Sequence, residues 1–206
     1  MPTPAVPLRA LADGLLQAGC LQFGSFVLKS GLQSPFYIDL RGIISYPRLL
    51  EQVGAAYLPV LRPLSFERLA ALPYAALPIA AAICMQGGYT MIYPRKEIKE
   101  YGTRAAIEGE YHSGERVVVV DDLATTGGSK FEAIERLSAA GLIVRDVVVL
   151  IDRQSGAREA LQKTGVALHA VLTIEQLLDY YESHGGVDPG RIAESRRFVR
   201  GAQSEG

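Results

Sequence analysis

Four consecutive valines run directly into two aspartates, and a turn rich in threonine and glycine follows. The valines are residues 117–120, and the acids are Asp121 and Asp122. An uninterrupted apolar run of this length suits a strand buried on both faces, as in a parallel sheet covered by helices. Ligands of such sheets bind beyond the carboxyl ends of the strands. The residues just after the valines are therefore the first candidates for a functional site.

Predicted strands and helices alternate along most of the chain, which is typical of the doubly wound α/β class. The predicted strands are residues 69–72, 89–93, 117–120, 144–151 and 166–172, and the predicted helices are residues 47–61, 77–85, 130–140, 156–163, 174–181 and 189–199. The first part of the chain, with a helix at 8–15 and short strands at 21–28 and 36–39, does not follow this alternation. We expect residues 1–206 to form a single domain in which about residues 1–45 form a small hood over the sheet.

Charge and cysteine content exclude several classes of protein. The chain has 21 Lys and Arg against 22 Asp and Glu, so no global basic field is present to hold nucleic acid. Cys20 and Cys84 are too few for a zinc site and lie in apolar stretches, as reduced core cysteines of a cytosolic protein do. We expect a cytoplasmic protein with no protein-built metal site and no nucleic-acid partner.

Residues 69–94 carry no Asp, Glu, Lys or Arg and are the one candidate for a membrane span. Prolines and glycines interrupt this stretch at several points. A spanning helix needs about 20 continuous apolar residues. A strand, a turn, a helix and a second strand therefore fit the stretch better, and we expect no membrane partner.

The turn after the acids combines backbone flexibility with hydroxyl groups at the start of a predicted helix. Its residues are Thr125, Thr126, Gly127, Gly128 and Ser129. Unpaired N–H groups and the positive end of the helix dipole suit a phosphate. Two adjacent carboxylates can instead accept hydrogen bonds from vicinal sugar hydroxyls or face a cation bound to the substrate. The combination predicts a phosphorylated sugar as ligand.

Other interpretations of this turn remain. It could be an ordinary strand-to-helix loop with acidic caps, or part of an acidic pocket of the receiver-domain type. A Walker-type nucleotide site is excluded because no Gly-Lys-Ser/Thr sequence is present, and no Gly-x-Gly-x-x-Gly sequence follows any predicted strand.

Residues 118–129 resemble the phosphoribosyl-diphosphate motif of type I phosphoribosyltransferases: a hydrophobic strand, two acids, then Thr-Thr-Gly-Gly-Ser. Three further stretches resemble orotate phosphoribosyltransferases within that superfamily. They are Ser-Pro-Phe-Tyr-Ile-Asp-Leu-Arg at 34–41, Arg-Lys-Glu-Ile-Lys-Glu-Tyr-Gly at 95–102 and Ile-Asp-Arg-Gln at 151–154. The four motifs occur in order over about residues 20–160. The motif at 118–129 indicates only the superfamily, and the other three bear on the acceptor base.

The resemblance implies a type I phosphoribosyltransferase-like parallel sheet flanked by helices. It also implies transfer of a 5-phosphoribosyl group from 5-phosphoribosyl 1-diphosphate to orotate, giving orotidine 5′-phosphate and pyrophosphate for UMP biosynthesis. Mg²⁺ would enter with the substrate. The protein would be a homodimer in which a basic loop closes over the neighbouring subunit's site.

Residue roles follow from the matched motifs. Asp121 and Asp122 would hold the ribose hydroxyls, and the turn at 125–129 would hold phosphate. The remaining implied site residues are Lys29 near the pyrimidine and diphosphate, Phe36 and Tyr37 against the base, Arg95, Lys96 and the catalytic Lys99 on the diphosphate, and Arg153 on the orotate carboxylate.

Plainer interpretations stand beside these roles. The basic run at 95–104 could be a solvated loop, Lys29 a solvent-exposed side chain, and the aromatic pair at 36–37 part of the core. Arg153 could form a structural ion pair with its neighbour Asp152.

The chain departs from many bacterial members of the family in two places. Ala75 follows Tyr74 where those members carry lysine, and Tyr101 stands where they carry histidine. Both departures resemble the branch that eukaryotes fuse to orotidylate decarboxylase, although 206 residues leave no room to expect a decarboxylase domain here. The rival functions are transfer to another base, such as a purine, and a regulator that senses the sugar diphosphate without catalysis. Only about 20 residues precede the first motif, too few to expect the DNA-binding domain that such regulators often add.

Overall fold

The four valines lie in strand β6 (Arg116–Ala124), a central strand of a six-stranded sheet in the computed structural model, which describes residues 8–28, 31–96 and 106–204. Val118 and Val120 pack into an apolar cluster on one side of this strand, and Val117 and Val119 pack into a second cluster. All four side chains are buried. The strand buried on both faces that the valine run predicted is therefore confirmed.

The sheet has the strand order β5-β4-β3-β6-β7-β8. Strands β3, β4, β6, β7 and β8 are parallel, and the short β5 pairs antiparallel with β4. The remaining strand bounds are β3 (Arg68–Ala71), β4 (Met91–Pro94), β5 (Ile107–Glu108), β7 (Ile143–Asp152) and β8 (Ala167–Thr173). A largely parallel sheet brings the carboxyl ends of its strands to one edge, which fixes where a site can form.

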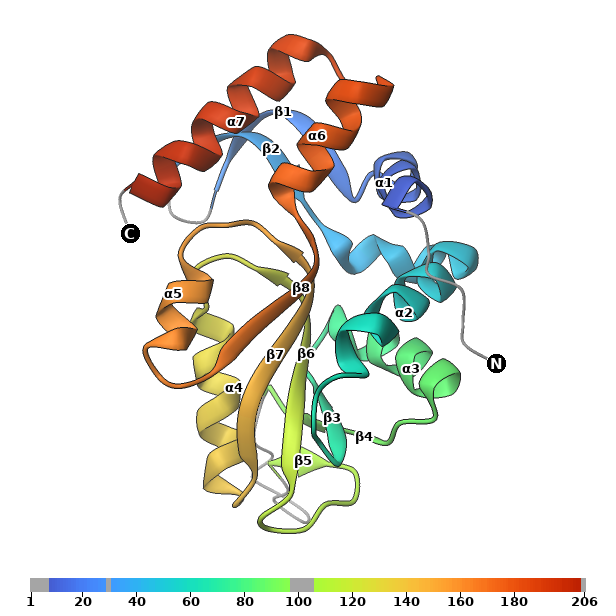
Figure 1. Ribbon diagram of the computed structural model, residues 1–206, viewed down its shortest axis with the longest axis vertical. Coiled ribbons are helices and arrows are strands. Elements are labelled where there is room, and N and C mark those ends of the chain that lie inside the picture. Colours follow the sequence, from blue (N-terminus) through green and yellow to red (C-terminus); the bar gives the residue numbers. More distant parts are fainter. Residues whose placement is uncertain (1–7, 29–30, 97–105, 205–206) are drawn as a thin grey trace.

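Helices cover both faces of the sheet (Figure 1). Helices α2 (Pro47–Leu61) and α3 (Ala76–Gly87) lie on one face, and α4 (Gly128–Ala139) and α5 (Ala157–Gln162) lie on the other. The predicted helix at 47–61 is confirmed to the residue. Helix α4 begins two residues before the predicted start, so the last residues of the glycine-rich turn already belong to its first turn.

An antiparallel hairpin of β1 (Leu21–Val27) and β2 (Gln33–Ile38) lies beyond the end of the sheet (Figure 1). Helix α1 (Leu8–Gln17) precedes the hairpin, and a 3-10 helix, η1 (Leu40–Ser45), follows it. The chain then enters α2 at Pro47, where proline suits the first helical turn.

The two C-terminal helices, α6 (Ile174–His184) and α7 (Pro189–Ser204), pack beside this hairpin and α1 (Figure 1). The Tyr181 hydroxyl donates a hydrogen bond to the carbonyl of Ala12 over 2.7 Å, and the rings of Phe36 and Phe198 meet edge to face at 5.9 Å. The hood-like part of the molecule is thus built from both ends of the chain. The sequence predicted only the N-terminal part of the hood. The apolar faces of the two C-terminal helices do not reveal which element they pack against.

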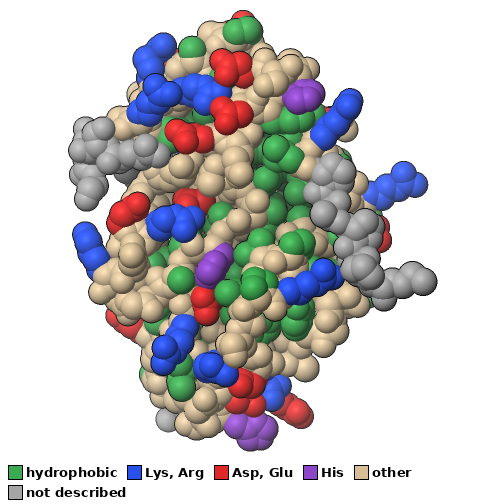
Figure 2. Space-filling model, viewed as in Figure 1, with side chains coloured by type: hydrophobic (Ala, Val, Ile, Leu, Met, Phe, Trp, Pro, Cys, Tyr) green, Lys and Arg blue, Asp and Glu red, His purple; other side chains and the backbone are tan. Residues whose placement is uncertain are grey.

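Residues 69–94 form most of β3, a turn, α3 and the whole of β4. In the part of the chain that the structure describes, no helix is both long enough and apolar enough to cross a membrane. On the face drawn in Figure 2, acidic and basic side chains are interspersed. This distribution agrees with the formal net charge of −1.

Candidate active site

A cleft of about 360 Å³ lies where the hairpin meets the carboxyl ends of β3 and β6. Three segments line it: the end of β2 with the start of η1, the turn before α3, and the two acids of β6. The lining residues are Tyr37, Ile38, Asp39, Leu40, Arg41, Pro73, Tyr74, Ala75, Asp121 and Asp122. The cleft lies at the strand edge where the sheet topology places ligands.

The two acids occupy different environments at this edge. Asp121 is 7% exposed, and its carboxylate accepts hydrogen bonds from the Asp122 backbone N–H over 3.0 Å and from the Lys130 ammonium over 2.6 Å. Asp122 is less buried, and its Oδ1 accepts the backbone N–H of Leu123 over 2.9 Å. The structure thus brings both predicted acids to the cleft, with Asp121 more fully engaged by protein groups.

Burial and the neighbouring Asp121 carboxylate raise the pKa of Asp122 from 3.8 to about 7. The Lys130 ammonium acts in the opposite direction and limits the rise. On the α2 side, the Tyr57 hydroxyl donates to the Asp121 carbonyl over 2.7 Å, and burial with these acids holds the pKa of Tyr57 well above 10.0. A carboxyl group that titrates near neutrality in a cleft is a candidate for ligand binding.

The turn at 125–129 connects this acid pair to helix α4. Gly127 adopts a left-handed conformation, with φ of 91°, and a β-carbon there would lie 3.2 Å from the Phe131 ring. A β-carbon on Gly128 would meet nothing within 4 Å, so the backbone there is open to a close approach. Among the described residues, no side chain caps the first turn of α4. The Lys130 N–H already donates to the Gly127 carbonyl over 2.9 Å, so the N–H groups of Gly128 and Ser129 are the candidates for binding an anion.

The two aromatic residues of β2 point to different places. Tyr37 lines the cleft and stacks on Phe26, with ring centroids 5.6 Å apart. Phe36 is buried, and its ring lies against the guanidinium of Arg153, 5.0 Å from ring centroid to guanidinium carbon. Tyr37 is therefore the member of this pair that faces the cleft.

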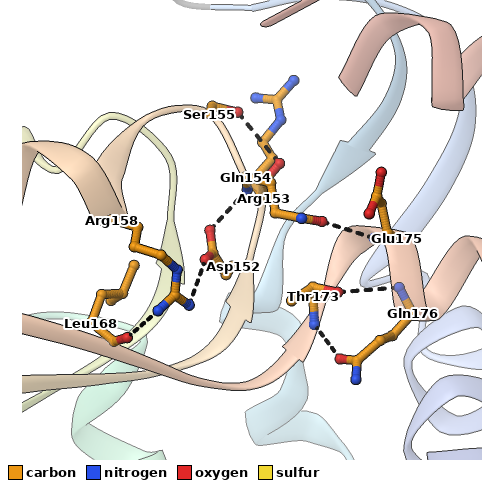
Figure 3. Close-up of polar contacts among 9 residues, drawn as sticks. All are labelled: Asp152, Arg153, Gln154, Ser155, Arg158, Leu168, Thr173, Glu175 and Gln176. Carbon is orange, nitrogen blue, oxygen red and sulfur yellow. Dashed lines mark hydrogen bonds and ion pairs between the residues drawn. The ribbon is translucent and has the colours of Figure 1, made fainter. Parts of the chain in front are cut away.

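Arg153 is not paired with its neighbour Asp152. Asp152 accepts hydrogen bonds from the Gln154 backbone and from the Arg158 guanidinium, at 2.8 and 3.1 Å, as Figure 3 shows. Arg153 instead donates to the Ser34 hydroxyl over 3.2 Å. Its Nε is buried and has no partner among the described residues. The ion pair with Asp152 that was considered for Arg153 is thus absent from the described part of the chain. The Nε of Arg153 is a buried donor without a partner there, next to Ser34 of the hairpin.

The basic residues of the predicted loop differ in their surroundings. Arg95 forms an ion pair with Glu108 of β5, and its carbonyl accepts a hydrogen bond from Arg136 over 2.6 Å. Lys96 is exposed, and its ammonium lies 5.2 Å from the ring centroid of Tyr74 at the mouth of the cleft. Lys29 and Lys99 lie outside the residues that the structure describes.

Three contacts at or near the site were not predicted. Lys130 contacts Asp121, Tyr57 contacts the carbonyl of the same residue, and Phe198 lies 5.4 Å from Arg153. Of these contacts, only that of Lys130 could have been inferred from the sequence. A basic side chain in the first turn of a helix opposes the helix dipole and therefore indicates a compensating partner. No group of three or more Asp, Glu, His or Cys residues suited to a metal ion occurs within residues 8–28, 31–96 and 106–204.

Named relatives resemble this chain over most of its length, although no family model matches it. The bifunctional enzyme PyrF/PyrE of Nostoc sp. is 43% identical over 88% of this chain, which spans only 38% of that protein. The orotate phosphoribosyltransferase of Methanopyrus kandleri is 44% identical over 81% of this chain and 90% of its own length.

Solved structures give the same picture of the fold. Leishmania donovani UMP synthase superimposes with a TM-score of 0.87 and 46% identity, over 93% of this chain and 42% of that one. The orotate phosphoribosyltransferase of Mycobacterium tuberculosis in complex with 5-phospho-α-D-ribosyl 1-diphosphate superimposes with a TM-score of 0.68 and 28% identity, over 83% of this chain and 99% of that one.

Proposed function

Because this chain belongs to the orotate phosphoribosyltransferase family, we propose that it transfers the 5-phosphoribosyl group of 5-phosphoribosyl 1-diphosphate to N1 of orotate. The products are orotidine 5′-phosphate and pyrophosphate, and the reaction serves UMP biosynthesis. The M. tuberculosis relative has been solved with the same sugar diphosphate. The chain also matches the part of longer bifunctional relatives that spans about two fifths of their length.

One observation carries this proposal: a half-buried carboxylate and an uncapped helix start are joined by a short glycine-rich turn. Asp122 lines the cleft, and the first turn of α4 begins at Gly128. Vicinal sugar hydroxyls donate to the carboxylate, while the 5-phosphate accepts from backbone N–H groups of residues 125–129. A phosphorylated sugar satisfies both groups at once.

The protein's part in the reaction is positioning and charge stabilisation. The bond from the anomeric carbon to the diphosphate breaks ahead of the bond to the base, so positive charge develops on the sugar ring. The carboxylate of Asp122 favours that charge, and its fixed position avoids the cost of reorganising solvent. Lys96, exposed at the cleft mouth beside Tyr74, is placed to approach the departing diphosphate.

The donor set of the site fits a magnesium ion that arrives with the substrate. The described residues offer no cluster of three acidic, histidine or cysteine side chains. Mg²⁺ commonly keeps several waters and binds through substrate phosphates. When bound, it supplies positive charge to the diphosphate, which makes that group a better leaving group.

The base is recognised under the hairpin. The Arg153 guanidinium, with its unpaired Nε, supplies the cation for the orotate carboxylate, and the exposed side of Tyr37 supplies a wall of the pocket. Uracil lacks that carboxylate and would leave the buried guanidinium without a counter-charge.

We also propose a cytoplasmic homodimer with shared active sites. The family resemblance supports this assembly, in which the basic residues after Lys96, including Lys99, act on the partner's substrate. Lys29 has its role near the pyrimidine on the same ground.

The loss of orotate absorbance, measured with the sugar diphosphate and Mg²⁺, tests the function directly. Uracil, hypoxanthine and adenine serve as parallel acceptors. We expect turnover with orotate alone. Turnover of a purine but not of orotate would support phosphoribosyl transfer and contradict orotate as the acceptor base. Tight binding of the sugar diphosphate with no turnover of any base would identify a sensor instead.

A further inference from the structure

A lysine is buried at the start of α4, in a position that a helix ordinarily disfavours. Lys130 is the third residue of α4 and is 3% exposed. A positive charge in the first helical turn opposes the helix dipole, and a buried ammonium needs compensation. A position so costly on both counts indicates a specific partner.

The ammonium of Lys130 has three acceptors, which matches its three N–H donors. It donates to Asp121 Oδ2 over 2.6 Å, to the carbonyl of Leu123, and to the Ser129 hydroxyl over 3.5 Å. Asp121 and Leu123 belong to the end of β6, whereas Lys130 and Ser129 belong to the first turn of α4. The lysine therefore ties the acid-bearing end of the strand to the start of the helix.

This arrangement separates the roles of the two acids. Each oxygen of the Asp121 carboxylate already accepts a hydrogen bond, one from the Asp122 N–H and one from Lys130. Asp122 accepts a hydrogen bond from the Leu123 N–H and retains acceptor capacity toward the cleft. The charge of Lys130 offsets that of Asp121, so an ionised Asp122 meets less repulsion beside it.

We propose that Lys130 is a positioning residue that neutralises Asp121 and aligns the adjacent Asp122 with the phosphate-binding turn, leaving Asp122 as the acid that holds the sugar hydroxyls. The proposal rests on the proposed function, since it names how that site binds the sugar diphosphate. Asp121 then supports the site through Lys130 and does not bind the sugar itself.

The decisive variants remove the two charges separately and together. Lys130→Met shortens the unbranched side chain by one atom and removes its charge, which leaves Asp121 uncompensated. Asp121→Asn/Lys130→Met removes both charges and leaves no unpaired ion. Lys163→Met, an exposed lysine just after α5, is the matched control.

The measurement is the Kd of 5-phosphoribosyl 1-diphosphate with Mg²⁺ and no base, by isothermal calorimetry, with circular dichroism to confirm folding. We expect Lys130→Met to weaken binding about tenfold to a hundredfold, the size of a lost charge-assisted interaction. The double variant should recover to within about tenfold of the unmodified protein, because the environment of Asp122 is again balanced. Lys163→Met should bind as the unmodified protein does.

The pH dependence of the same binding separates positioning from a merely structural role. The charged and titratable groups that face Asp122 are Asp121 on its own strand, Lys130 from α4, Tyr57 from α2 and Arg41 from the segment after the hairpin. In Lys130→Met, the pH at which the affinity for the sugar diphosphate reaches half of its maximum should be higher than in the unmodified protein. In Asp121→Asn/Lys130→Met, this pH midpoint should return toward the unmodified value. A lysine that only stabilises the fold would leave this midpoint unchanged.

Unchanged binding and an unchanged midpoint in Lys130→Met would overturn the proposal. If that variant does not fold, the double variant decides, and binding as poor as that of Asp122→Asn would overturn it. Binding without turnover of orotate would overturn the proposed function and leave this test intact. Failure of the unmodified protein to bind the sugar diphosphate would overturn both.

Discussion

The guanidinium of Arg153 contacts two phenylalanine rings, and one of them, Phe198, comes from the C-terminal helix α7. The guanidinium carbon is 5.4 Å from the Phe198 ring centroid and 5.0 Å from that of Phe36. An aromatic ring attracts a guanidinium whose carbon lies within about 6 Å of the ring centroid, so contact with two rings restricts where the guanidinium can lie. Helix α7 thereby takes part in orienting the arginine proposed to bind the base.

Arg153→Ala should weaken the use of orotate far more than the binding of the sugar diphosphate. The lost contact is charge-assisted and bidentate, which corresponds to about one to two decades in kcat/KM for orotate. Phe198→Leu should act in the same direction and more weakly, by about twofold to thirtyfold, because it removes one of the two ring contacts of the guanidinium.

Phe66→Leu is the matched control, since Phe66 contacts the ring of Tyr89 and lies away from Arg153. Steady-state kinetics with each substrate varied in turn would separate the two effects. An equal loss for orotate and for the sugar diphosphate in Phe198→Leu would contradict a role in orienting Arg153.

Asp122→Asn should lower turnover about tenfold to a hundredfold while the protein stays folded, since the change removes a charge from a cleft and leaves the apolar core intact. Asp146→Asn is a matched control, because Asp146 contacts His169 over 2.8 Å outside the cleft. Turnover and thermal unfolding would be measured on the same preparations. Unchanged turnover in Asp122→Asn would remove the sugar-hydroxyl role.

The sequence predicted what depends on local pattern. The helix at 47–61, the buried strand and the acid pair before the glycine-rich turn follow from runs of residues close together in the chain. The contacts that complete the site join distant residues: 64 positions separate Tyr57 from Asp121, and Arg153 meets a ring of the last helix. No local signal encodes such pairs.

Arg95 illustrates the same limit. The family resemblance implied that Arg95 binds the diphosphate, and that role stays a prediction. The sequence did not predict that its side chain pairs with Glu108 of β5, a strand of two residues. Lys130 could have been noticed, because its position breaks a rule of helix termini.

The raised pKa of Asp122 should make stability and ligand binding respond oppositely to pH. The folded protein holds a proton on this group up to about pH 7, whereas the unfolded chain releases it near 3.8. The free energy of unfolding should therefore fall as pH rises from about 4 to about 7, by no more than about 4 kcal/mol. Affinity for the sugar diphosphate should rise through the same window, because hydroxyl donors bind the ionised form.

Asp122→Asn should flatten both curves, and denaturant titrations and calorimetry across that pH range would show it. A wild-type stability that rises between pH 4 and 7 with the same slope in Asp122→Asn would contradict this assignment.

Arg68 and Glu115 should stabilise the fold in a pH-dependent way. Two N–H groups of Arg68, the first residue of β3, donate to the two oxygens of Glu115, just before β6, at 2.6 and 2.9 Å. The hydrogen bond from Arg68 lowers the pKa of Glu115 from 4.5 to about 2. The pair's contribution is therefore present above about pH 4.5 and is lost as pH falls through about 2.

Arg68→Gln should lower the Tm at pH 7, and the difference from the unmodified protein should shrink toward pH 2. Arg191→Gln breaks the exposed pair with Glu194 and should change the Tm little at any pH. A difference in Tm that is independent of pH would show that Arg68 contributes through packing alone.

Mixing two inactive variants tests the shared active site of the proposed homodimer. Asp122→Asn disables the sugar-binding part of a site, and Lys99→Ala disables the basic loop proposed to act on the partner's substrate. In a two-fold dimer with random exchange, about half of the dimers carry one subunit of each kind, and each of these has one site with both parts intact. Activity should therefore return to about a quarter of the value expected for the unmodified sites.

Subunit exchange must be shown independently, for example by energy transfer between differently labelled subunits. The control mixes Lys99→Ala with the double variant Asp122→Asn/Lys99→Ala, since no subunit then carries an intact Lys99 and no intact combination arises. Recovery in the first mixture and none in the second would place Lys99 in the partner's site. Proven exchange with no recovered activity would mean that each subunit completes its own site.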